Sequence, residues 1–381
     1  MKKSKTNNNK KILVVFGTRP EAIKLFPVIK SLKNNDLNVS VCVTSQQKEM
    51  LHQVINFFEI DIDHDLKVMR RNQSLFDTTS IIIKKLETVI QLEKPELIIC
   101  HGDTTSALCA SIASFYFQIP LAHVEAGLRT ETIHSPFPEE FNRRVISLTA
   151  SYHFAPTKIA MDNLIKEGIS KKNIFITGNT VIDALLNCVQ RFDQKQSLFP
   201  KLKFMEAFDP EKKIILVTGH RRESFGKGFT EIFSALILLA SKFDIEIIYP
   251  VHLNPNVYNL AKKMLLNIKN IHLIEPLDYQ SFTYLLNQSY IVLTDSGGIQ
   301  EEAPSLNIPV VVMRESTERP EGVSANTSLL VGANQERIES AVTNLLSDRN
   351  LYNKMAKSKN PYGDGKASDR ITKIIQQKIF N

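Results

Sequence analysis

Residues 292–322 read VLTDSGGIQEEAPSLNIPVVVMRESTERPEG, and this stretch sets the expected fold class. An apolar, β-branched run ends at Asp295, the chain breaks at Ser296-Gly297-Gly298, and a helical pattern follows. A second apolar run, PVVVMRE, occupies residues 309–315. A strand, a helix and a second strand in this order form the repeating unit of a parallel sheet. Glycines at the strand-to-helix turn let a ligand approach closely, and free N–H groups at the helix start attract phosphate.

The charged residues of this unit indicate a nucleotide-diphosphate ligand. The predicted helix carries Glu301 and Glu302, and carboxylates in its first turn suit a ribose diol, as the acidic residue of dinucleotide folds does. Arg314 and Arg319 follow the next strand and can contact phosphate. A tight turn would explain Gly297-Gly298 alone, but the serine, glutamates and arginines in one unit favour a nucleotide site.

Short apolar runs alternate with helical patterns along the whole chain, which is typical of parallel βαβ units. Amphipathic helices such as 21–33 and 105–117 separate the strands of the first half. The predicted strands are 11–18, 38–44, 96–103, 120–126, 152–157, 173–178, 213–220, 245–252, 271–276, 290–298 and 309–315. Parallel open sheets bind ligands at the carboxyl ends of their strands, where most of the unusual polar residues of this chain fall. We therefore expect an α/β protein of GT-B architecture, with two Rossmann-like, doubly wound domains facing a central cleft.

A length of 381 residues favours two domains. The polar segment 190–213, with Pro200 and Pro210, is the expected hinge region. We expect a disordered leader at 1–10, an N-terminal domain at 11–190, a C-terminal domain at 191–365 and a helix at 366–381 that packs back on the N-terminal domain.

Composition narrows the class of protein. The net charge of +7 includes five lysines within the first eleven residues, and the remaining charge is near +2 without a basic stripe, so nucleic acid is not expected as a partner. No apolar run approaches the ~20 residues of a membrane span. The cysteines show no metal spacing and favour a reducing, cytoplasmic setting; they are Cys42, Cys100, Cys109 and Cys188.

Several polar residues follow predicted strands of the first half. Arg19 lies in a strand–helix loop and Lys24 one turn into the helix, so both can face one anion. Asp103 and Glu125 follow apolar strands, and Glu139 opens a helix after a Ser-Pro-Phe-Pro turn. Unpaired buried carboxylates are costly, so three such acids indicate proton transfer beside a sugar. Metal binding is the competing use, but no metal-site spacing of histidine and acid accompanies them.

Two further features have simpler alternatives. Glu140 is interpreted as an ordinary acid at a helix start. His220 ends a strand and precedes Arg221-Arg222-Glu223, and His252 repeats this position one unit later. A lone strand-end histidine is more often structural, but two at equivalent positions beside basic residues favour contacts to phosphate or to a leaving group. No Walker loop, GxSxG or GxGxxG motif occurs.

At these residues the chain resembles the bacterial UDP-N-acetylglucosamine 2-epimerases of the non-hydrolysing kind. The resemblance runs from Phe16 to beyond Gly363. Its motifs, in order, are FGTRPEAIK (16–24), HGDTTSA (101–107), HVEAGLRT (123–130), SPFPEEFNRR (135–144), ITGNTVIDAL (176–185), TGHRRE (218–223), YPVHLNPNV (249–257), LTDSGGIQEEAPSL (293–306), ERPEG (318–322) and NPYGDG (360–365).

The resemblance implies a GT-B fold, a homodimer, a UDP-sugar substrate, and neither metal nor cofactor. The family reaction eliminates UDP from C1 with loss of the C2 proton, giving 2-acetamidoglucal, and re-adds UDP after the proton returns on the opposite face. The product, UDP-N-acetylmannosamine, supplies cell-surface polysaccharides. The matching catalytic residues are Asp103, Glu125, Glu139 and His220. Matching substrate contacts are Arg19, Lys24, Arg143, Ser296, Gly297, Gly298, Glu302 and Arg319, with Leu277 and Phe282 in the loop that holds uracil. His252 is also predicted to contact the substrate, because of its position at a strand end and not because of the resemblance.

One departure concerns regulation. Many relatives bind a second UDP-N-acetylglucosamine as an activator through a loop that resembles QHRQM or QHREM, followed later by Arg-Gln. Here the loop is Gln46-Gln47-Lys48-Glu49-Met50, and Asn72-Gln73 follows. Gln47 replaces a usual histidine and Asn72 a usual arginine, although Arg70 and Arg71 are close by in the sequence, and these changes lead us to expect weaker activation. The candidate regulatory residues are Gln46, Glu49 and Asn72.

Three alternatives to reversible epimerisation stay open at this stage. The first is hydrolysis that releases N-acetylmannosamine and UDP. The second is epimerisation of a modified UDP-N-acetylhexosamine. The third, of a different class, is a GT-B glycosyltransferase in which Asp103 or a histidine acts as base for an acceptor hydroxyl.

Overall fold

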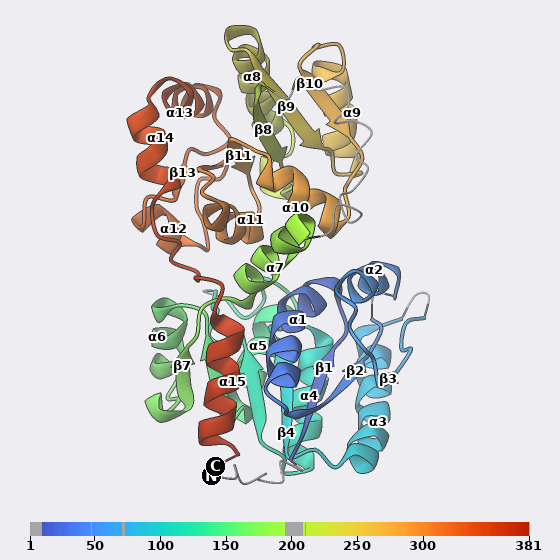
Figure 1. Cartoon of the computed structure of the whole chain (residues 1–381). Coiled ribbons are helices and arrows are strands. Elements are labelled where there is room, and N and C mark those ends of the chain that lie inside the picture. The colour runs from blue at the N-terminus through green and yellow to red at the C-terminus, as the bar shows by residue number, and fades with distance from the viewer. Residues whose placement is uncertain are drawn as a thin grey trace. The chain divides into compact units, whose positions relative to one another are not determined.

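The computed structural model describes residues 10–46, 48–70, 73–130, 132–194, 209 and 211–380, without the side chains of 48–50, 193 and 194. The chain forms two units (Figure 1). Unit 1 extends to Ala184 and resumes at Gly363, and unit 2 runs from Leu185 to Tyr362. The sequence placed these boundaries after residues 190 and 365. Of the expected leader, residues 1–9 lie outside the described residues.

Unit 1 is built on a parallel sheet of seven strands in the described part of the chain, in the order β3-β2-β1-β4-β5-β6-β7. The strands are β1 Lys11–Phe16, β2 Asn38–Val43, β3 His64–Asp65, β4 Leu97–His101, β5 Leu121–Val124, β6 Tyr152–Ala155 and β7 Ile174–Ile176. The helices are α1 Arg19–Asn34, α2 Lys48–Phe58, α3 Leu75–Glu93, α4 Thr105–Tyr116, α5 Glu139–Thr149, α6 Lys158–Lys166 and α15 Ala367–Lys378, with a short 3₁₀ turn, η1, at Lys171–Asn173. The strand order reverses between β1 and β4, which is where open α/β sheets bind ligands.

Unit 2 repeats the plan with six described parallel strands in the order β10-β9-β8-β11-β12-β13. The strands are β8 Lys213–Thr218, β9 Ile245–Pro250, β10 Ile271–Ile274, β11 Ile291–Thr294, β12 Val310–Val312 and β13 Ser328–Leu330. Its helices are η4 Arg222–Ser224, α8 Lys227–Lys242, α9 Pro255–Leu265, α10 Tyr279–Asn287, α11 Gly297–Glu302, η5 Ala303–Leu306, α12 Pro320–Ser324, α13 Gln335–Ser347 and α14 Arg349–Ala356. The reversal here lies between β8 and β11.

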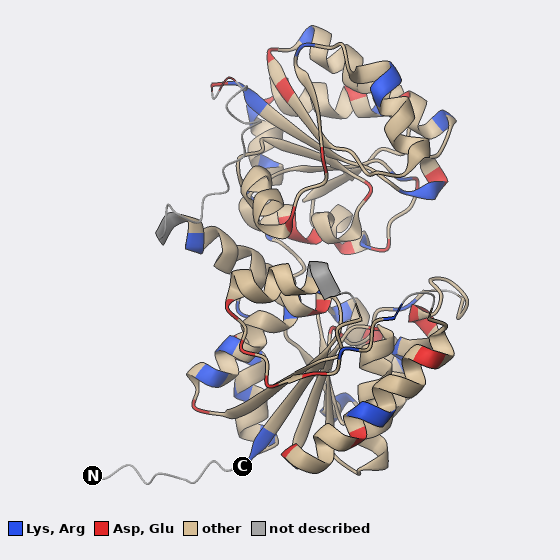
Figure 2. Ribbon diagram, turned by 90° about the vertical axis from the view of Figure 1, so that its right-hand side faces the viewer, with Lys and Arg blue, Asp and Glu red and all other residues tan. Residues whose placement is uncertain are grey.

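Apolar strand residues form the cores of both units. In β1 every residue from Ile12 to Phe16 is fully buried, and Ile215, Leu216 and Val217 of β8 are equally buried. In Figure 2 the acidic and basic residues of the described chain lie mostly on helices and loops, and the strands are mostly uncharged. Strands buried on both faces read as continuous apolar runs, which is why the sequence located them well.

The expected hinge region was partly wrong. Residues 190–194 belong to helix α7 (Thr180–Gln194), within which the boundary between the units falls, and β8 already begins at Lys213. An amphipathic pattern therefore continues into a segment that looked polar. Pro200 and Pro210 lie outside the described residues.

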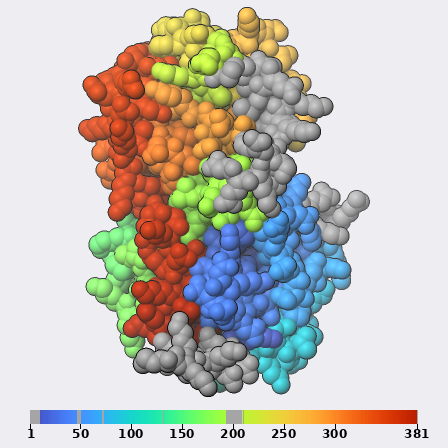
Figure 3. Space-filling view, in the orientation of Figure 1, coloured from blue at the N-terminus to red at the C-terminus, as the bar shows by residue number. Residues whose placement is uncertain are grey.

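The last helix, α15, completes unit 1 by packing against α1 (Figures 1 and 3). Asp183 caps it, accepting hydrogen bonds from the backbone N–H of Ala367 at 3.2 Å and of Ser368 at 2.8 Å. Ser31 of α1 donates to Asp369 at 2.9 Å and accepts from Thr372 at 3.0 Å. The chain thus returns to unit 1 after unit 2 and is held there by specific polar contacts as well as apolar packing.

Candidate active site

The turn between β1 and α1 is organised by a buried glutamate. Glu21, 1% exposed, accepts hydrogen bonds through Oε2 from the backbone N–H of Gly17 at 3.0 Å and of Thr18 at 2.8 Å. Thr18 Oγ1 at 2.8 Å and Thr104 Oγ1 at 2.7 Å also donate to this carboxylate. Burial raises the pKa of Glu21, although these donors oppose the rise. The carboxylate therefore ties the loop after β1 to the loop after β4 and fixes the start of the helix that carries Arg19.

Glu125 lies next to two nitrogen groups just after β5. Its Oε2 is 2.5 Å from Lys24 Nζ of α1 and 3.4 Å from His101 Nε2 at the end of β4. Burial would raise the pKa of Glu125, but Lys24 and His101 hold it well below its usual value. The residue has a left-handed backbone, φ 62°, a conformation that non-glycine residues adopt at some energetic cost. The free protein therefore presents an ionised carboxylate in a constrained position.

Asp103 and the first turns of α5 are joined. Arg143 of α5 forms an ion pair with the Asp103 carboxylate, and Asn142 donates its side-chain amide to the Asp103 carbonyl at 2.8 Å. Glu140 is not the ordinary helix-start acid that the sequence suggested. It is fully buried, accepts from Arg144 at 2.8 Å and from the Thr130 backbone at 3.1 Å, and so anchors the loop before α5.

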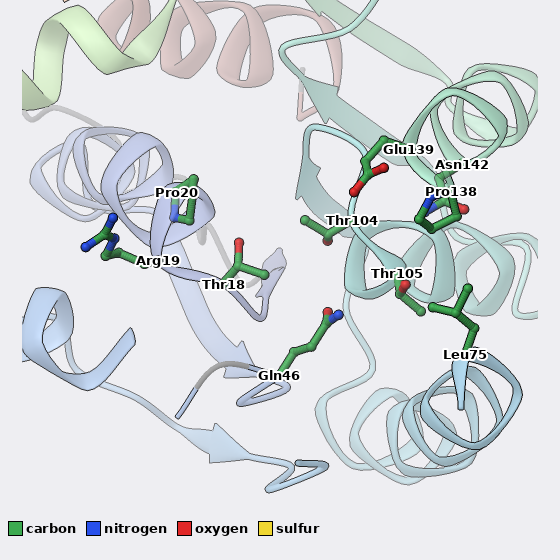
Figure 4. Close-up of a pocket in the computed structure, with 10 residues that line it drawn as sticks. All are labelled: Thr18, Arg19, Pro20, Gln46, Leu75, Thr104, Thr105, Pro138, Glu139 and Asn142. Atoms are coloured by element: carbon green, nitrogen blue, oxygen red, sulfur yellow. The ribbon is translucent and has the colours of Figure 1, made fainter. Parts of the chain in front are cut away.

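A cavity of about 410 Å³ opens beside these residues in unit 1 (Figure 4). Arg19 lies on one side of it and Glu139 on the other, with Gln46 and Thr104 between them. Its full lining is Thr18, Arg19, Pro20, Gln46, Leu75, Thr104, Thr105, Pro138, Glu139 and Asn142. Unit 1 thus brings the three predicted acids to one edge of its sheet, since Asp103 and Glu125 follow neighbouring strands and α5 carries Glu139.

Unit 2 places both predicted histidines at the carboxyl edge of its own sheet. The rings of His220 and His252 stack with their centroids 5.3 Å apart and their planes at 17°. Asp295, at the end of β11 and 1% exposed, accepts from the backbone N–H of His220 and of Arg221, each at 2.7 Å. Burial lowers the pKa of His220 despite the opposing charge of Asp295, and His252 and Arg221 act in the same direction as burial. The His220 imidazole is therefore neutral in the free protein near pH 7.

The Ser296-Gly297-Gly298 turn begins helix α11, as the sequence predicted, but the carboxylates were misplaced. Glu301 and Glu302 occupy the last two positions of this six-residue helix, and its first turn contains no acid. Glu301 is 3% exposed and forms an ion pair with Arg319. Glu302 is half-buried and therefore more exposed than Glu301. A helix that begins directly at Gly297 moves both acids a turn further along than expected.

Arg314 is held by acidic residues of unit 2. Its guanidinium is 6% exposed and is paired with Glu223 at 2.7 Å and with Glu318 at 3.6 Å. These pairs tie the strand end to the loop after β8. Arg319, which begins the next helix as its N-cap, remains beside Gly297, whose added Cβ would lie 3.8 Å from the Arg319 guanidinium.

The residues expected at a uracil ring precede or begin α10. Leu277 and Phe282 are partly buried against the apolar cluster that includes Leu216, Ile248 and Val292. Tyr279 lies between these two residues in the sequence. Burial, together with the nearby Glu302 carboxylate, holds the pKa of Tyr279 well above its usual value. The Glu302 side chain and the start of α10 are therefore neighbours.

Of the candidate regulatory residues, the structure describes the side chain of Gln46. Gln46 lines the cavity and accepts a hydrogen bond from Ser106 at 3.1 Å. The Glu49 side chain and Asn72 lie outside the described residues. Within the described chain no three His, Cys, Asp or Glu residues gather as a metal site, and no helix there is long and apolar enough to cross a membrane.

The model of the family described as UDP-N-acetylglucosamine 2-epimerase matches residues 30–376. The chain belongs to this family. It is 51% identical over 374 residues to the UDP-N-acetylglucosamine 2-epimerase of Campylobacter jejuni, covering 96% of this chain and 97% of that protein. It is 52% identical over 369 residues to the enzyme of the same name from Yersinia pestis, covering 96% and 98%.

A solved structure extends the likeness to the fold. The UDP-GlcNAc 2-epimerase of Neisseria meningitidis, bound to UDP-GlcNAc, matches with a TM-score of 0.86 and 45% identity over 97% of this chain and all of that one. Family membership and the GT-B-like, two-domain α/β fold predicted from sequence are thus confirmed.

Three residues that position this family's motifs were missed from the sequence. Glu21 stands three residues after Thr18, a capping-box spacing that would have located it. His101 directly precedes Gly102-Asp103 but looked like a strand residue. Asp295 follows a strand, as Asp103 does, but it was not selected because the glycines after it were the stronger signal for a ligand site.

Proposed function

We propose that this protein catalyses the reversible C2 epimerisation of UDP-N-acetylglucosamine to UDP-N-acetylmannosamine. The observation that carries the proposal is the position of Glu125, which is paired with Lys24 at 2.5 Å and lies at the same edge of the sheet as Asp103 and Glu139. A group that removes a C2 proton must be deprotonated beforehand, and Glu125 meets this condition in the free protein.

The proposed reaction has two halves. In the elimination, the C2–H bond breaks and a carboxylate of unit 1 takes the proton, while the C1–O bond breaks and its electron pair leaves with UDP. The product of this half is 2-acetamidoglucal. In the return, a second acid of the same group delivers a proton to the opposite face of C2, and a UDP oxygen adds to C1. Two faces require more than one acid, which three carboxylates provide.

The UDP part of the substrate is assigned to unit 2. Negative charge builds on the departing phosphate oxygen, and groups already aimed at that oxygen stabilise it. His220, His252 and the Ser296-Gly297-Gly298 turn follow adjacent strands at the point where the strand order reverses. Arg319 and Glu302 are assigned to the phosphate and the ribose, with Leu277 and Phe282 at the uracil. In unit 1, Arg19 and Arg143 are assigned to substrate contacts.

A second copy of this chain is the proposed partner. Apolar side chains are exposed on three helices of unit 1 that pack side by side: Phe76 of α3, Phe115 and Tyr116 of α4, and Leu148 of α5. Contiguous exposed apolar patches mark interfaces, and these four side chains lie on neighbouring helices. Sedimentation equilibrium tests the dimer. The four cysteines are free thiols, which supports the cytoplasm as the compartment.

Proton NMR of UDP-N-acetylglucosamine with the protein in D2O tests the proposed function. Exchange of the C2 proton, with the sugar still attached to UDP, is the expected result. Release of free N-acetylmannosamine would replace the proposal by the hydrolysing reaction. An unchanged spectrum would reject it and leave a modified UDP-N-acetylhexosamine, or the acceptor of a glycosyltransferase, as the substrate to seek.

Glu302→Ala is expected to weaken UDP binding about tenfold to a hundredfold, because hydrogen bonds to charged groups contribute roughly 1.5–3 kcal/mol. Isothermal titration calorimetry with UDP measures this loss. Glu336→Ala, an exposed acid in the first turn of α13, is the matched control. Unchanged UDP affinity for Glu302→Ala would contradict the ribose assignment.

Activation by UDP-N-acetylglucosamine is expected to be weaker here than in relatives with the complete regulatory loop. An activator diphosphate would need a cation at the sequence position of Asn72, and asparagine does not supply one. The measurement uses UDP-N-acetylmannosamine as sole substrate. Immediate linear turnover is expected, whereas strict dependence on added UDP-N-acetylglucosamine would show that the substitutions leave the activator site intact.

A further inference from the structure

The loops after β8 and β11 are joined by a carboxylate with one unused oxygen. Asp295 Oδ2 accepts two backbone hydrogen bonds, from His220 and Arg221. Asp295 Oδ1 is buried without a hydrogen-bond partner among the described residues, and it lies 3.6 Å from His220 Nδ1. A buried carboxylate oxygen left unpaired is costly, so this arrangement calls for a donor that the free protein does not yet supply.

A neutral His220 ring with its hydrogen on Nδ1 could supply that donor, but Nε2 would then carry no hydrogen. Only a protonated ring offers a donor at both nitrogens. With Nδ1 protonated and the ring charged, the 3.6 Å approach can tighten into a charge-assisted hydrogen bond to Oδ1. The opposite ring nitrogen, Nε2, then carries a second N–H, and the ring is 47% exposed, so this donor can reach a ligand. Asp–His pairs of this kind hold an imidazole in one orientation while its other nitrogen acts on a substrate.

The groups around His220 decide when it becomes charged. From the loops after β8, β9 and β11 it faces Arg221, His252 and Asp295, and the Tyr249 phenol lies near Asp295. Burial, Arg221 and His252 oppose a positive ring, and only Asp295 favours it. A bound diphosphate would add negative charge on the same side as Asp295, and a nearby opposite charge favours the protonated imidazole.

We propose that UDP binds to unit 2 together with one proton, which His220 takes up and Asp295 holds in place. This inference rests on the proposed function, in which unit 2 binds UDP. The proton comes from solvent and adds to the His220 ring. Nδ1–H then donates to Asp295 Oδ1, and Nε2–H donates to a diphosphate oxygen. The stacked His252 ring repels a second positive charge, so the pair accepts a single proton. Asp295 is the positioning residue, and its effect is exerted through His220.

Calorimetric titration of the whole protein with UDP tests this proposal. Titrations are run in buffers of different ionisation enthalpy at about pH 7.5, above the second pKa of a terminal phosphate, about 6. If a proton is taken up, the measured heat varies with the buffer, and the slope gives the number of protons. Uptake is expected for the wild-type protein and is expected to vanish in His220→Gln. In Asp295→Asn, uptake is expected to fall sharply and UDP affinity to drop about tenfold to a hundredfold.

Two variants separate positioning from general structural effects. Asp348→Asn changes another aspartate of unit 2 that accepts two backbone hydrogen bonds, from Asn350 at 2.8 Å and Leu351 at 3.1 Å, at the start of α14. It should keep the wild-type proton uptake. His252→Gln should also keep the proton uptake. If uptake were lost in His252→Gln but retained in His220→Gln, His252 would be the proton acceptor, and the proposal would be overturned.

The remaining outcomes are also decisive. UDP binding with the same heat in every buffer would overturn proton uptake while leaving the proposed function intact. Failure to bind UDP at all would overturn both. If Asp295→Asn does not fold, His220→Gln still decides whether His220 takes the proton, since its backbone N–H continues to bond Asp295. In that case, retained uptake in His220→Gln would reject the proposal.

Discussion

Glu125→Gln is expected to lower turnover by about 10²–10⁴-fold, the usual contribution of a general acid or base. The amide cannot take a proton from C2, and it loses the ion pair with Lys24. Asp103→Asn and Glu139→Gln are expected to cause losses of the same order. Epimerisation rates followed by NMR measure the effect, and circular dichroism shows whether each variant is folded.

Glu87→Gln provides the control for these three variants. Glu87 lies on α3 and makes an exposed ion pair with Lys84 at 3.3 Å, so its neutralisation should change neither rate nor folding. Folded variants of Asp103, Glu125 and Glu139 that all turn over near the wild-type rate would remove the carboxylates from the mechanism.

Glu21→Ala is expected to lower the free energy of unfolding by about 3–5 kcal/mol, because it leaves two backbone N–H groups and two hydroxyls without their buried acceptor. At roughly 2–4 °C per kcal/mol, this corresponds to a decrease in Tm of about 10 °C. Turnover should fall as well, since Arg19 and Lys24 lie on the helix that Glu21 fixes. Scanning calorimetry and chemical denaturation measure the loss.

Glu21→Gln separates the hydrogen bonds from the charge. The amide can still accept from Gly17 and Thr18 and can donate to Thr104, so its stability should lie close to wild type. Burial raises the pKa of Glu21, so the neutral carboxyl is favoured in the folded state. The stability that the neutral carboxyl adds is present below the pKa of Glu21 in the unfolded chain and is lost as the pH rises through its pKa in the folded protein. Across this pH window the amide variant should therefore become more stable relative to wild type. An alanine variant as stable as the amide variant would refute the assigned role.

The strands were predictable because both sheets are parallel and covered on both faces, so their strands read as apolar runs. β3 escaped notice because it is two residues, His64–Asp65, without an apolar pattern. β13 was missed because Ser328–Leu330 contains no β-branched apolar residue and is only partly buried, whereas β12, which has the same length, is three buried valines. Segment 190–194 was misread because a helix can be polar on the side that lacks a neighbour. Local composition therefore located the strands that carry an apolar run and missed the two edge strands that lack one, β3 and β13.

For the site, sequence indicated which residue types gather but not which of them pair. Glu301 and Glu302 are equivalent in a motif, and only the start of α11 at Gly297 decides that Glu301 meets Arg319. In the sequence Arg314 and Arg319 are similar candidates, but Arg314 is paired with Glu223, which lies far earlier in the chain. His101 and Lys24 meet at Glu125 across three separate elements. Pairing across such sequence distances depends on tertiary structure, which a pattern along the chain does not encode.

The return of the chain to α15 has a consequence for synthesis on the ribosome. Residues up to Ala184 emerge first, but the helix that covers α1, and that Asp183 caps, is made only after residue 366. At roughly 5–20 residues per second, the gap between the two lasts about 10–40 s. During that interval unit 2 is being synthesised, and unit 1 exposes the α1 surface that α15 later covers. Although it begins at the N-terminus, unit 1 is therefore the last part of the nascent chain to be completed.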